Sequence, residues 1–172
     1  FITFSGNGAD GSVVDGVTFT GGGVPSNSST REGLIRVSSA NATVTIRNSK
    51  ITSSLVQVHW NAINSVIYAI DANKVVLENC EISRNTVRFT YSQQGAGYIV
   101  VGKVDLIGCT LENNIFESAG SQISRTISLT SGNITNSKVK WSTPATGAPV
   151  ADVYAPNSVV TNTIVRGITI DS

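Results

Sequence analysis

The chain has 172 residues and a formal net charge of +1, and only 13% of its residues are charged. This length suffices for the core of one domain, and low charge combined with 40% hydrophobic residues excludes a disordered composition. There is no basic stripe for phosphate contacts, and no apolar run approaches the roughly 20 residues of a membrane span. We therefore expect one folded domain over residues 1–172 that neither binds nucleic acid nor inserts into a membrane.

The polar residues are mainly Ser, Thr, Asn and Gly, with Val and Ile as their apolar partners. This mixture is typical of short β-strands joined by tight turns. The sequence begins at Phe1, without Met or a signal peptide, and is strand-like from its first residue. We therefore expect the chain to be a fragment of a longer protein.

An eight-residue pattern recurs along the chain. Residues 44–51 read Val-Thr-Ile-Arg-Asn-Ser-Lys-Ile, residues 75–82 read Val-Val-Leu-Glu-Asn-Cys-Glu-Ile, and residues 104–111 repeat the pattern with Gly in place of Asn. The apolar residue two before the Asn serves as an anchor. The anchors are Val14, Ile46, Leu77, Leu106, Leu129 and Val160. A repeat of about 30 residues predicts a stacked repeat architecture.

Within each repeat the apolar residues alternate with polar ones, which predicts strands, and no helical spacing is present. In chain order, the expected strands lie at 1–4, 34–37, 44–47, 51 onward, 56–60, 66–70, 75–78, 82 onward, 87–91, 98–101, 104–107, 139–142 and 150–154. Residues 139–142 follow the anchor Leu129 at the same distance in sequence as the third strand follows the anchor in other repeats. Each repeat therefore contains three or four short strands.

Such a repeat buries its apolar face only by stacking on its neighbours, so that equivalent strands pair in parallel. The sequence predicts an all-β fold, a right-handed parallel β-helix of about five to six coils. The anchors face inward. Asn48, Asn79 and Asn162 form a column in left-handed turns, a conformation that Gly16 and Gly108 also accommodate.

The two cysteines, Cys80 and Cys109, share an inward column of small residues with Ser49, Gly132 and Thr163. Direct stacking at roughly 5 Å suits a disulfide, but we interpret them as small buried thiols. Two charge pairs, Arg47 with Glu78 and Lys50 with Glu81, are expected to face each other on the outer surface across one coil step.

The Val-x-Ile-x-Asn units at 44–51, 75–82 and 104–111 resemble those of the right-handed parallel β-helix superfamily. This superfamily includes pectate lyases, other polysaccharide-active enzymes, bacteriophage tailspikes and bacterial surface adhesins. The absence of Met, the low charge and the Ser/Thr/Asn/Gly richness are most similar to a tailspike or tail-fibre segment. The resemblance implies a homotrimer in the virion tail that binds host surface polysaccharide. A bacterial adhesin rod at the cell surface, or a secreted protein, is an alternative.

A polysaccharide hydrolase or lyase on the same fold is a further alternative. Glu78 and Asp105 lie on neighbouring coils with an expected separation of roughly 8 Å, within the about 5–9.5 Å that glycosidase carboxylates require. Arg47, however, offers Glu78 a structural partner. The clustered acids of a calcium-dependent lyase are missing, and the sequence indicates no metal site and no cofactor.

Aromatic residues supply the candidate ligand contacts. Trp60 and Tyr91 occupy equivalent positions on adjacent coils, and Tyr68 and Tyr98 lie on the following strands. Such rings either stack on sugar faces or pack in the core or an oligomer interface. His59, the only histidine, faces away from Trp60 on the same strand and completes the candidate set.

Overall fold

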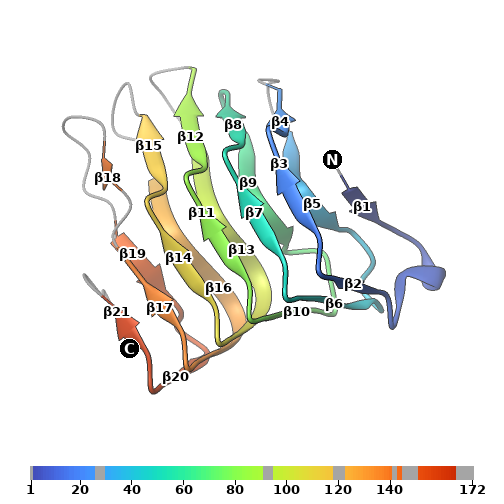
Figure 1. Ribbon diagram of the computed structural model, residues 1–172. Helices are drawn as coiled ribbons and strands as arrows, with labels where there is room; N and C mark the ends of the chain where they lie inside the picture. The colour runs from blue at the N-terminus through green and yellow to red at the C-terminus, as the bar shows by residue number, and fades with distance from the viewer. Residues whose placement is uncertain are drawn as a thin grey trace.

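A computed structural model of the chain describes residues 2–25, 30–90, 95–117, 123–140, 143–144 and 151–165. These residues form a parallel β-solenoid of about four turns (Figure 1). The predicted parallel coil is therefore confirmed. The periodicity alone predicts five to six coils because it assigns a full coil to every anchor, whereas the outermost rungs are short edge strands.

Three sheets run along the solenoid, and all their pairings are parallel. The ten-stranded sheet contains β1 (Ile2–Phe4), β2 (Val13–Asp15), β5 (Arg31–Val37), β6 (Thr43–Arg47), β9 (Ile63–Ala69), β10 (Lys74–Glu78), β13 (Ala96–Ile107), β16 (Ile123–Thr135), β19 (Ala151–Tyr154) and β20 (Ser158–Thr161). The six-stranded sheet contains β3 (Thr18–Thr20), β7 (Lys50–Thr52), β11 (Glu81–Ser83), β14 (Thr110–Glu112), β17 (Lys138–Val139) and β21 (Ile164–Val165).

The five-stranded sheet contains β4 (Gly23–Val24), β8 (Leu55–Val58), β12 (Thr86–Phe89), β15 (Ile115–Glu117) and β18 (Thr143–Pro144). A short 3-10 helix, η1 (Asn7–Ala9), belongs to the first turn. In register, each strand pairs with its equivalents one coil before and after, so that Ile46 lies between Val14 and Leu77. The solenoid therefore stacks identical positions into columns along its axis.

Two glycines allow long strands to turn a corner. The ten-stranded sheet has two rows, one with β1, β5 and β9 and the other with β2, β6 and β10. β13 and β16 each run through both rows, and Gly102 and Gly132 lie at their bends with φ of 112° and 132°. A Cβ at Gly132 would collide with the backbone of Val104, and the pairing register shifts next to Gly102. Only glycine combines this backbone conformation with so close an approach.

The predicted left-handed turns are confirmed. Asn48, Asn79 and Asn162 have φ of 50°, 51° and 48°, and Gly16 and Gly108 adopt the same region. A second left-handed corner follows one strand later, and it contains Gly21, Ser53, Arg84 and Asn113. Asn and Gly occupy most of these positions because they adopt this conformation with little steric cost.

One anchor is assigned wrongly by the sequence pattern. Leu106 pairs with Ile134, and Ile134 pairs with Val160, whereas Leu129 lies opposite Gly102. The error arises because β16 crosses two rows and carries apolar inward residues in both. As a consequence, Ser137 rather than Gly132 follows Cys109 in the small-residue column.

The same shift changes a predicted strand. Val139 pairs with Leu111 in β17 and so belongs to the second strand of its coil, not the third. Trp141, which the sequence placed beside it, lies outside the described residues.

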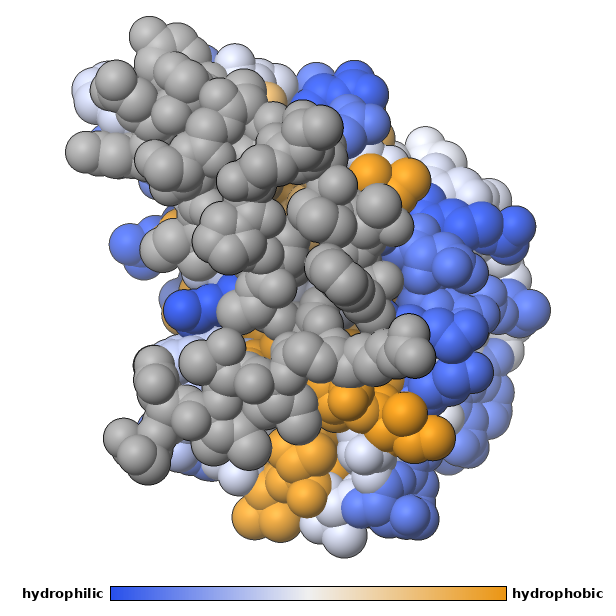
Figure 2. Space-filling model, turned by 90° about the vertical axis from the view of Figure 1, so that its left-hand side faces the viewer, coloured by the Kyte–Doolittle hydropathy of each residue, from blue (hydrophilic) through white to orange (hydrophobic). Residues whose placement is uncertain are grey.

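The core consists of the inward columns. Val44, Ile46, Val75, Leu77 and Leu106 are all 0% exposed. The end of the stack that contains β20 and β21 is more open, because Val160, which is in line with the inward residue Ile134, is 37% exposed. Figure 2 is viewed from this side and shows hydrophobic surface bordered by hydrophilic side chains. The solenoid buries its apolar residues well only where a coil lies on both sides.

Candidate functional site

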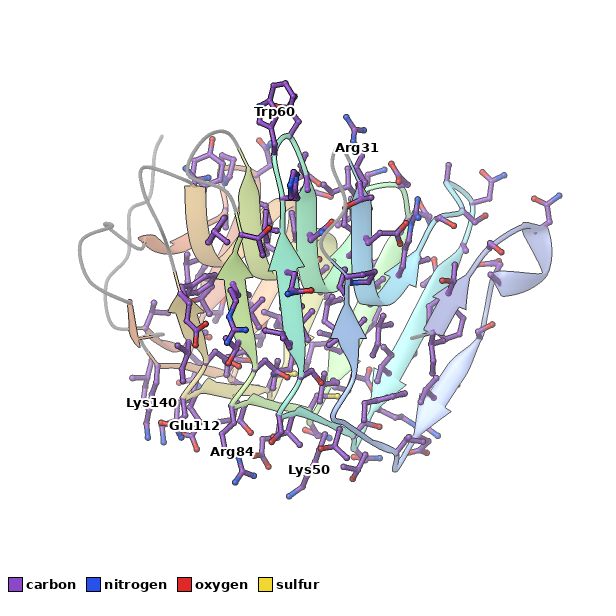
Figure 3. All side chains as sticks on the ribbon, turned by 90° about the horizontal axis from the view of Figure 1, so that it is seen from above. Arg31, Lys50, Trp60, Arg84, Glu112 and Lys140 are labelled. Carbon is purple, nitrogen blue, oxygen red and sulfur yellow. The ribbon has the colours of Figure 1, made fainter. Side chains whose placement is uncertain are left out.

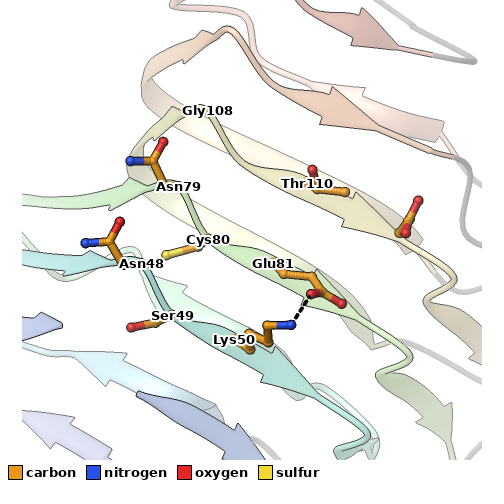
Figure 4. Close-up of a pocket in the computed structure, with 9 residues that line it drawn as sticks. Asn48, Ser49, Lys50, Asn79, Cys80, Glu81, Gly108 and Thr110 are labelled. Carbon is orange, nitrogen blue, oxygen red and sulfur yellow. Dashed lines mark ion pairs between the residues drawn. The ribbon is translucent and has the colours of Figure 1, made fainter. Parts of the chain in front are cut away.

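A groove of about 530 Å³ crosses three successive coils at the corner that leads from β6 and β10 into β7, β11 and β14 (Figure 4). Each coil contributes the residue in the left-handed turn and the first outward residue of the next strand; the first two coils add the small inward residue between them, and the third adds Glu112. The lining residues are Asn48, Ser49, Lys50, Asn79, Cys80, Glu81, Gly108, Thr110 and Glu112. The groove is therefore a direct product of the repeat.

Carboxamides form one wall of the groove. Asn48 Nδ2 donates a hydrogen bond to Asp15 Oδ1 at 2.9 Å, while Asn79 is exposed. Gly108 follows Asn79 in the column, and a Cβ at Gly108 would lie 2.5 Å from Asn79 Oδ1. The glycine therefore leaves room for the Asn79 carboxamide at the edge of the groove.

Charged groups form the opposite wall. Lys50 Nζ lies 3.1 Å from Glu81 Oε2, which confirms the predicted pair, and Ser83 Oγ donates to Glu81 Oε1 at 2.7 Å. These hydrogen bonds, from Ser83 and then Lys50, lower the pKa of Glu81 below its ordinary value. The side chain is thus held as an ionised carboxylate.

The next coils continue this wall. Lys140 Nζ lies 2.8 Å from Glu112 Oε2, and its hydrogen bond lowers the pKa of Glu112. Thr110 pairs with Glu81 in register and adds a hydroxyl to the wall, two residues before Glu112 on the same strand. The wall therefore presents ammonium, carboxylate and hydroxyl groups in successive coils.

The predicted catalytic pair, Glu78 and Asp105, lies outside this groove lining. Asp105 is opposite Val76 and thus two positions along from the partner of Glu78, as the sequence predicted. Its Oδ2 lies 2.9 Å from Lys74 Nζ, and its Oδ1 accepts the Asn133 N–H at 2.9 Å. Asp105 therefore joins three coils, and its side chain is only 14% exposed.

The predicted ion pair between Arg47 and Glu78 is wrong, although their register is right. The two residues are Cα partners, but Arg47 Nε lies 2.9 Å from Asp15 Oδ2 on the other neighbouring coil. Asp15 also faces Arg47 in register, so the sequence offered the arginine two equivalent carboxylates. Hydrogen bonds from Asn48 and then Arg47 lower the pKa of Asp15.

The predicted aromatic set is divided between different surroundings. Trp60 is 48% exposed and projects from the edge of the solenoid opposite to Lys50 and Glu112 (Figure 3). His59 is partly buried beside it, at the end of β8. Tyr91 lies outside the described residues. Tyr68 and Tyr98 are 0% and 9% exposed and pack together with Ala96 and Val101.

Tyr68 combines deep burial with an unused polar group. Its hydroxyl has no hydrogen-bond partner among the residues that the structure describes, and the Arg36 guanidinium lies 5.7 Å from the centre of its ring. Burial raises the pKa of Tyr68. Neither Tyr68 nor Tyr98 presents a ring face to solvent, so among the described members of the set only Trp60 offers an exposed aromatic surface.

A buried asparagine ladder was missed by the sequence analysis. Asn85 Oδ1 accepts the Ser54 N–H at 3.2 Å, and its Nδ2 donates to Ile51 O and to Asn114 Oδ1 at 3.0 and 3.1 Å. Asn114 Nδ2 donates in turn to Ile82 O at 3.0 Å. The signal was present, because Ser54, Asn85 and Asn114 each follow the residue of the second left-handed corner.

Comparison of the chain with protein-family models, curated proteins and solved structures gives no match. Among the described residues, no group of three or more His, Cys, Asp or Glu side chains is arranged to hold a metal ion. Within the same ranges, no helix has the length and apolar character needed to cross a membrane. The fold and the groove therefore carry the functional argument.

Proposed function

We propose that this chain is a right-handed β-solenoid segment of a bacteriophage tailspike or tail fibre that binds host surface polysaccharide. The groove between Asn48 and Glu112 is the proposed binding site. One observation carries the proposal: the three coils place Lys50, Glu81 and Thr110 in line along the groove, so that an ammonium, a carboxylate and a hydroxyl group follow one another, one per coil. Their spacing along the axis is that of stacked strands, about 4.8 Å, which is comparable to the length of one sugar residue.

The chemistry of the groove fits a ligand rich in hydroxyl groups. A sugar hydroxyl both donates and accepts hydrogen bonds, and the groove offers donors at Lys50 and Asn79 and acceptors at Asn79 and Glu81. The side chains are set by the coil and need little ordering when a ligand binds, which favours affinity. The groove crosses three coils and so suits an extended chain of sugars.

The test is calorimetric titration with capsule or O-antigen oligosaccharides. We expect Asn79→Gly and Glu81→Gln to weaken binding at least tenfold, because the first removes a carboxamide from the groove and the second replaces a charged acceptor by a neutral amide, while both leave the backbone conformation intact. Arg88→Gln is the matched control, since Arg88 pairs with Glu117 on the outer face of β12. Unchanged affinity in both groove variants would contradict the proposal.

Trp60→Ala separates the two candidate surfaces. Trp60 projects from the opposite edge (Figure 3), so its removal is expected to leave binding unchanged if the groove is the site. Loss of binding in Trp60→Ala alone would move the site to that edge. In the same experiment, assays for new reducing or unsaturated sugar ends test for cleavage, and we expect none.

The proposal also includes assembly into a homotrimer in the virion tail. A slender solenoid with an exposed flank favours a symmetric bundle that covers the flank. Light scattering on the purified chain is expected to give three times the monomer mass. A monomer would favour an isolated rod and would contradict this part of the proposal.

A further inference from the structure

Cys80 and Cys109 face each other across one coil step. Glu78 pairs with Ile107 and Glu81 pairs with Thr110, so the two cysteines lie between matched partners on both sides. Their side chains are 2% and 1% exposed, and both point inward. Directly stacked strands are about 4.8 Å apart, within the roughly 4.4–6.8 Å between Cα atoms that a disulfide requires.

The small-residue column inclines each side chain toward the preceding coil. Cys80 Sγ lies 3.3 Å from Ile46 O, and Cys109 Sγ lies 3.2 Å from Leu77 O, each a carbonyl one coil back. Ser137 Oγ makes the equivalent contact with Leu106 O at 3.4 Å. Because both cysteines incline in the same direction, their sulfurs stay in line and remain one coil step apart. The hydrogen bond with Cys80, together with burial, raises the pKa of Cys109.

Hydroxyl side chains satisfy the same column without sulfur. Ser137 and Thr163 donate to the anchor carbonyl one coil back, as the cysteines do. The fold therefore does not require a thiol at positions 80 and 109. Yet the two cysteines of the whole chain occupy these adjacent rungs. Their placement brings two thiols next to each other, which the packing of the column does not require.

We propose that Cys80 and Cys109, which are free thiols in the structure, are an oxidisable pair that closes a disulfide between adjacent coils. Cys80 lines the groove (Figure 4), so a small oxidant reaches it first. The bond would tie together the two coils that carry Asn79 and Gly108. The inference concerns the column and is independent of the proposed glycan binding.

The reaction proceeds by exchange with a low-molecular-weight disulfide such as oxidised glutathione. The Cys80 thiolate attacks one sulfur of the reagent, which forms a mixed disulfide and releases one reagent thiolate. The Cys109 thiolate then attacks the Cys80 sulfur and releases the second. Two protein thiols lose two protons and two electrons, and the reagent disulfide is reduced to two thiols.

The test compares oxidation of the folded chain with that of shifted pairs. After treatment of the native protein with oxidised glutathione, we expect an intact mass lower by two hydrogens and loss of both alkylatable thiols. Both changes should be reversed by dithiothreitol. The oxidised protein is expected to unfold several-fold more slowly in urea. Retention of two free thiols under conditions that oxidise the unfolded chain would overturn the proposal.

Two cysteine shifts serve as matched controls. The double variant Ser49→Cys/Cys109→Ser moves the pair one coil back, with Cys80 now facing position 49, and should oxidise like the wild type. Ser49→Cys/Cys80→Ser separates the thiols by two coils, about 9.6 Å, and should instead retain glutathione adducts. If both double variants closed a disulfide equally fast, opening of the fold and not the column geometry would be responsible, and the proposal would be wrong. Circular dichroism checks that each variant is folded.

Discussion

Asn79 and Asn85 are six positions apart on the same coil, yet they contribute in different ways. Asn79 is exposed in a left-handed turn at the edge of the groove, where the next coil has glycine. Asn85 is 0% exposed, and both ends of its carboxamide are hydrogen-bonded to neighbouring coils. The first position requires a backbone conformation and leaves its side chain available to a ligand. The second requires the side chain itself.

Asn85→Ala should have the largest effect. It removes the acceptor of the buried Ser54 N–H and the hydrogen bonds to the Ile51 carbonyl and to Asn114. Buried polar groups without partners cost about 1–3 kcal/mol each, so we expect a loss of about 3 kcal/mol of unfolding free energy. Urea unfolding followed by circular dichroism measures it. Asn79→Gly is the control and should change stability by less than about 0.5 kcal/mol. Equal effects would remove the distinction between the two positions.

Arg84→Asn should stabilise the protein by about 1 kcal/mol, because a non-glycine residue other than Asn or Asp pays roughly that amount in the left-handed region. Arg84 has φ of 55°, and Asn113 already occupies the equivalent place one coil later. The same urea titration measures the gain. A loss of stability would show that the arginine side chain, and not the backbone, determines this corner.

Tyr68→Phe extends the comparison to a buried polar group without a partner. Asn85 is fully bonded, whereas the Tyr68 hydroxyl is buried and unpaired. Removing it should therefore leave stability unchanged or raise it by up to about 1 kcal/mol. Thermal unfolding provides the measurement. A marked destabilisation would indicate that the hydroxyl has a partner, such as a bound water.

Glu81→Gln should have the smallest effect on stability, and the effect should depend on pH. Hydrogen bonds from Ser83 and Lys50 lower the pKa of Glu81 in the folded state. Its contribution is therefore present above the unfolded value of about 4.3 and is lost as the pH falls through the lower folded value. We expect a small loss at about pH 7 that disappears near pH 3 and shrinks with added salt. A loss of the same size at both pH values would exclude the charge as its cause.

The repeat allowed much of the fold to be predicted. The Val-x-Ile-x-Asn spacing identified the parallel coil, the left-handed turns at Asn48 and Asn79, and the pair between Lys50 and Glu81. It failed at Leu129, because the inward alternation continues through both rows of β16 and two apolar residues fit the same pattern. It also assigned Arg47 to Glu78, since a stacked column offers each charge a neighbour on either side.

The candidate site was less predictable. The sequence pattern gave each residue that lines the groove a structural role of its own, as a turn residue, a small buried residue or a surface charge. It gave no sign that these residues lie together around one groove. The sequence left open whether the aromatic residues stack on a ligand or pack in the core, and the structure places Tyr68 and Tyr98 in buried positions. Alternation along a strand indicates the side of the sheet on which a residue lies, but it does not reveal what covers that side.

The sequence by itself determined the coil, its columns and most of their register, since these depend on local alternation and on turn residues that recur at a nearly constant interval. The tertiary structure decided which neighbour each charge selects, which asparagine is buried, and where columns meet to form a groove. These features depend on how adjacent coils are placed against one another in three dimensions. The repeat in the sequence specifies the columns but not the space between them.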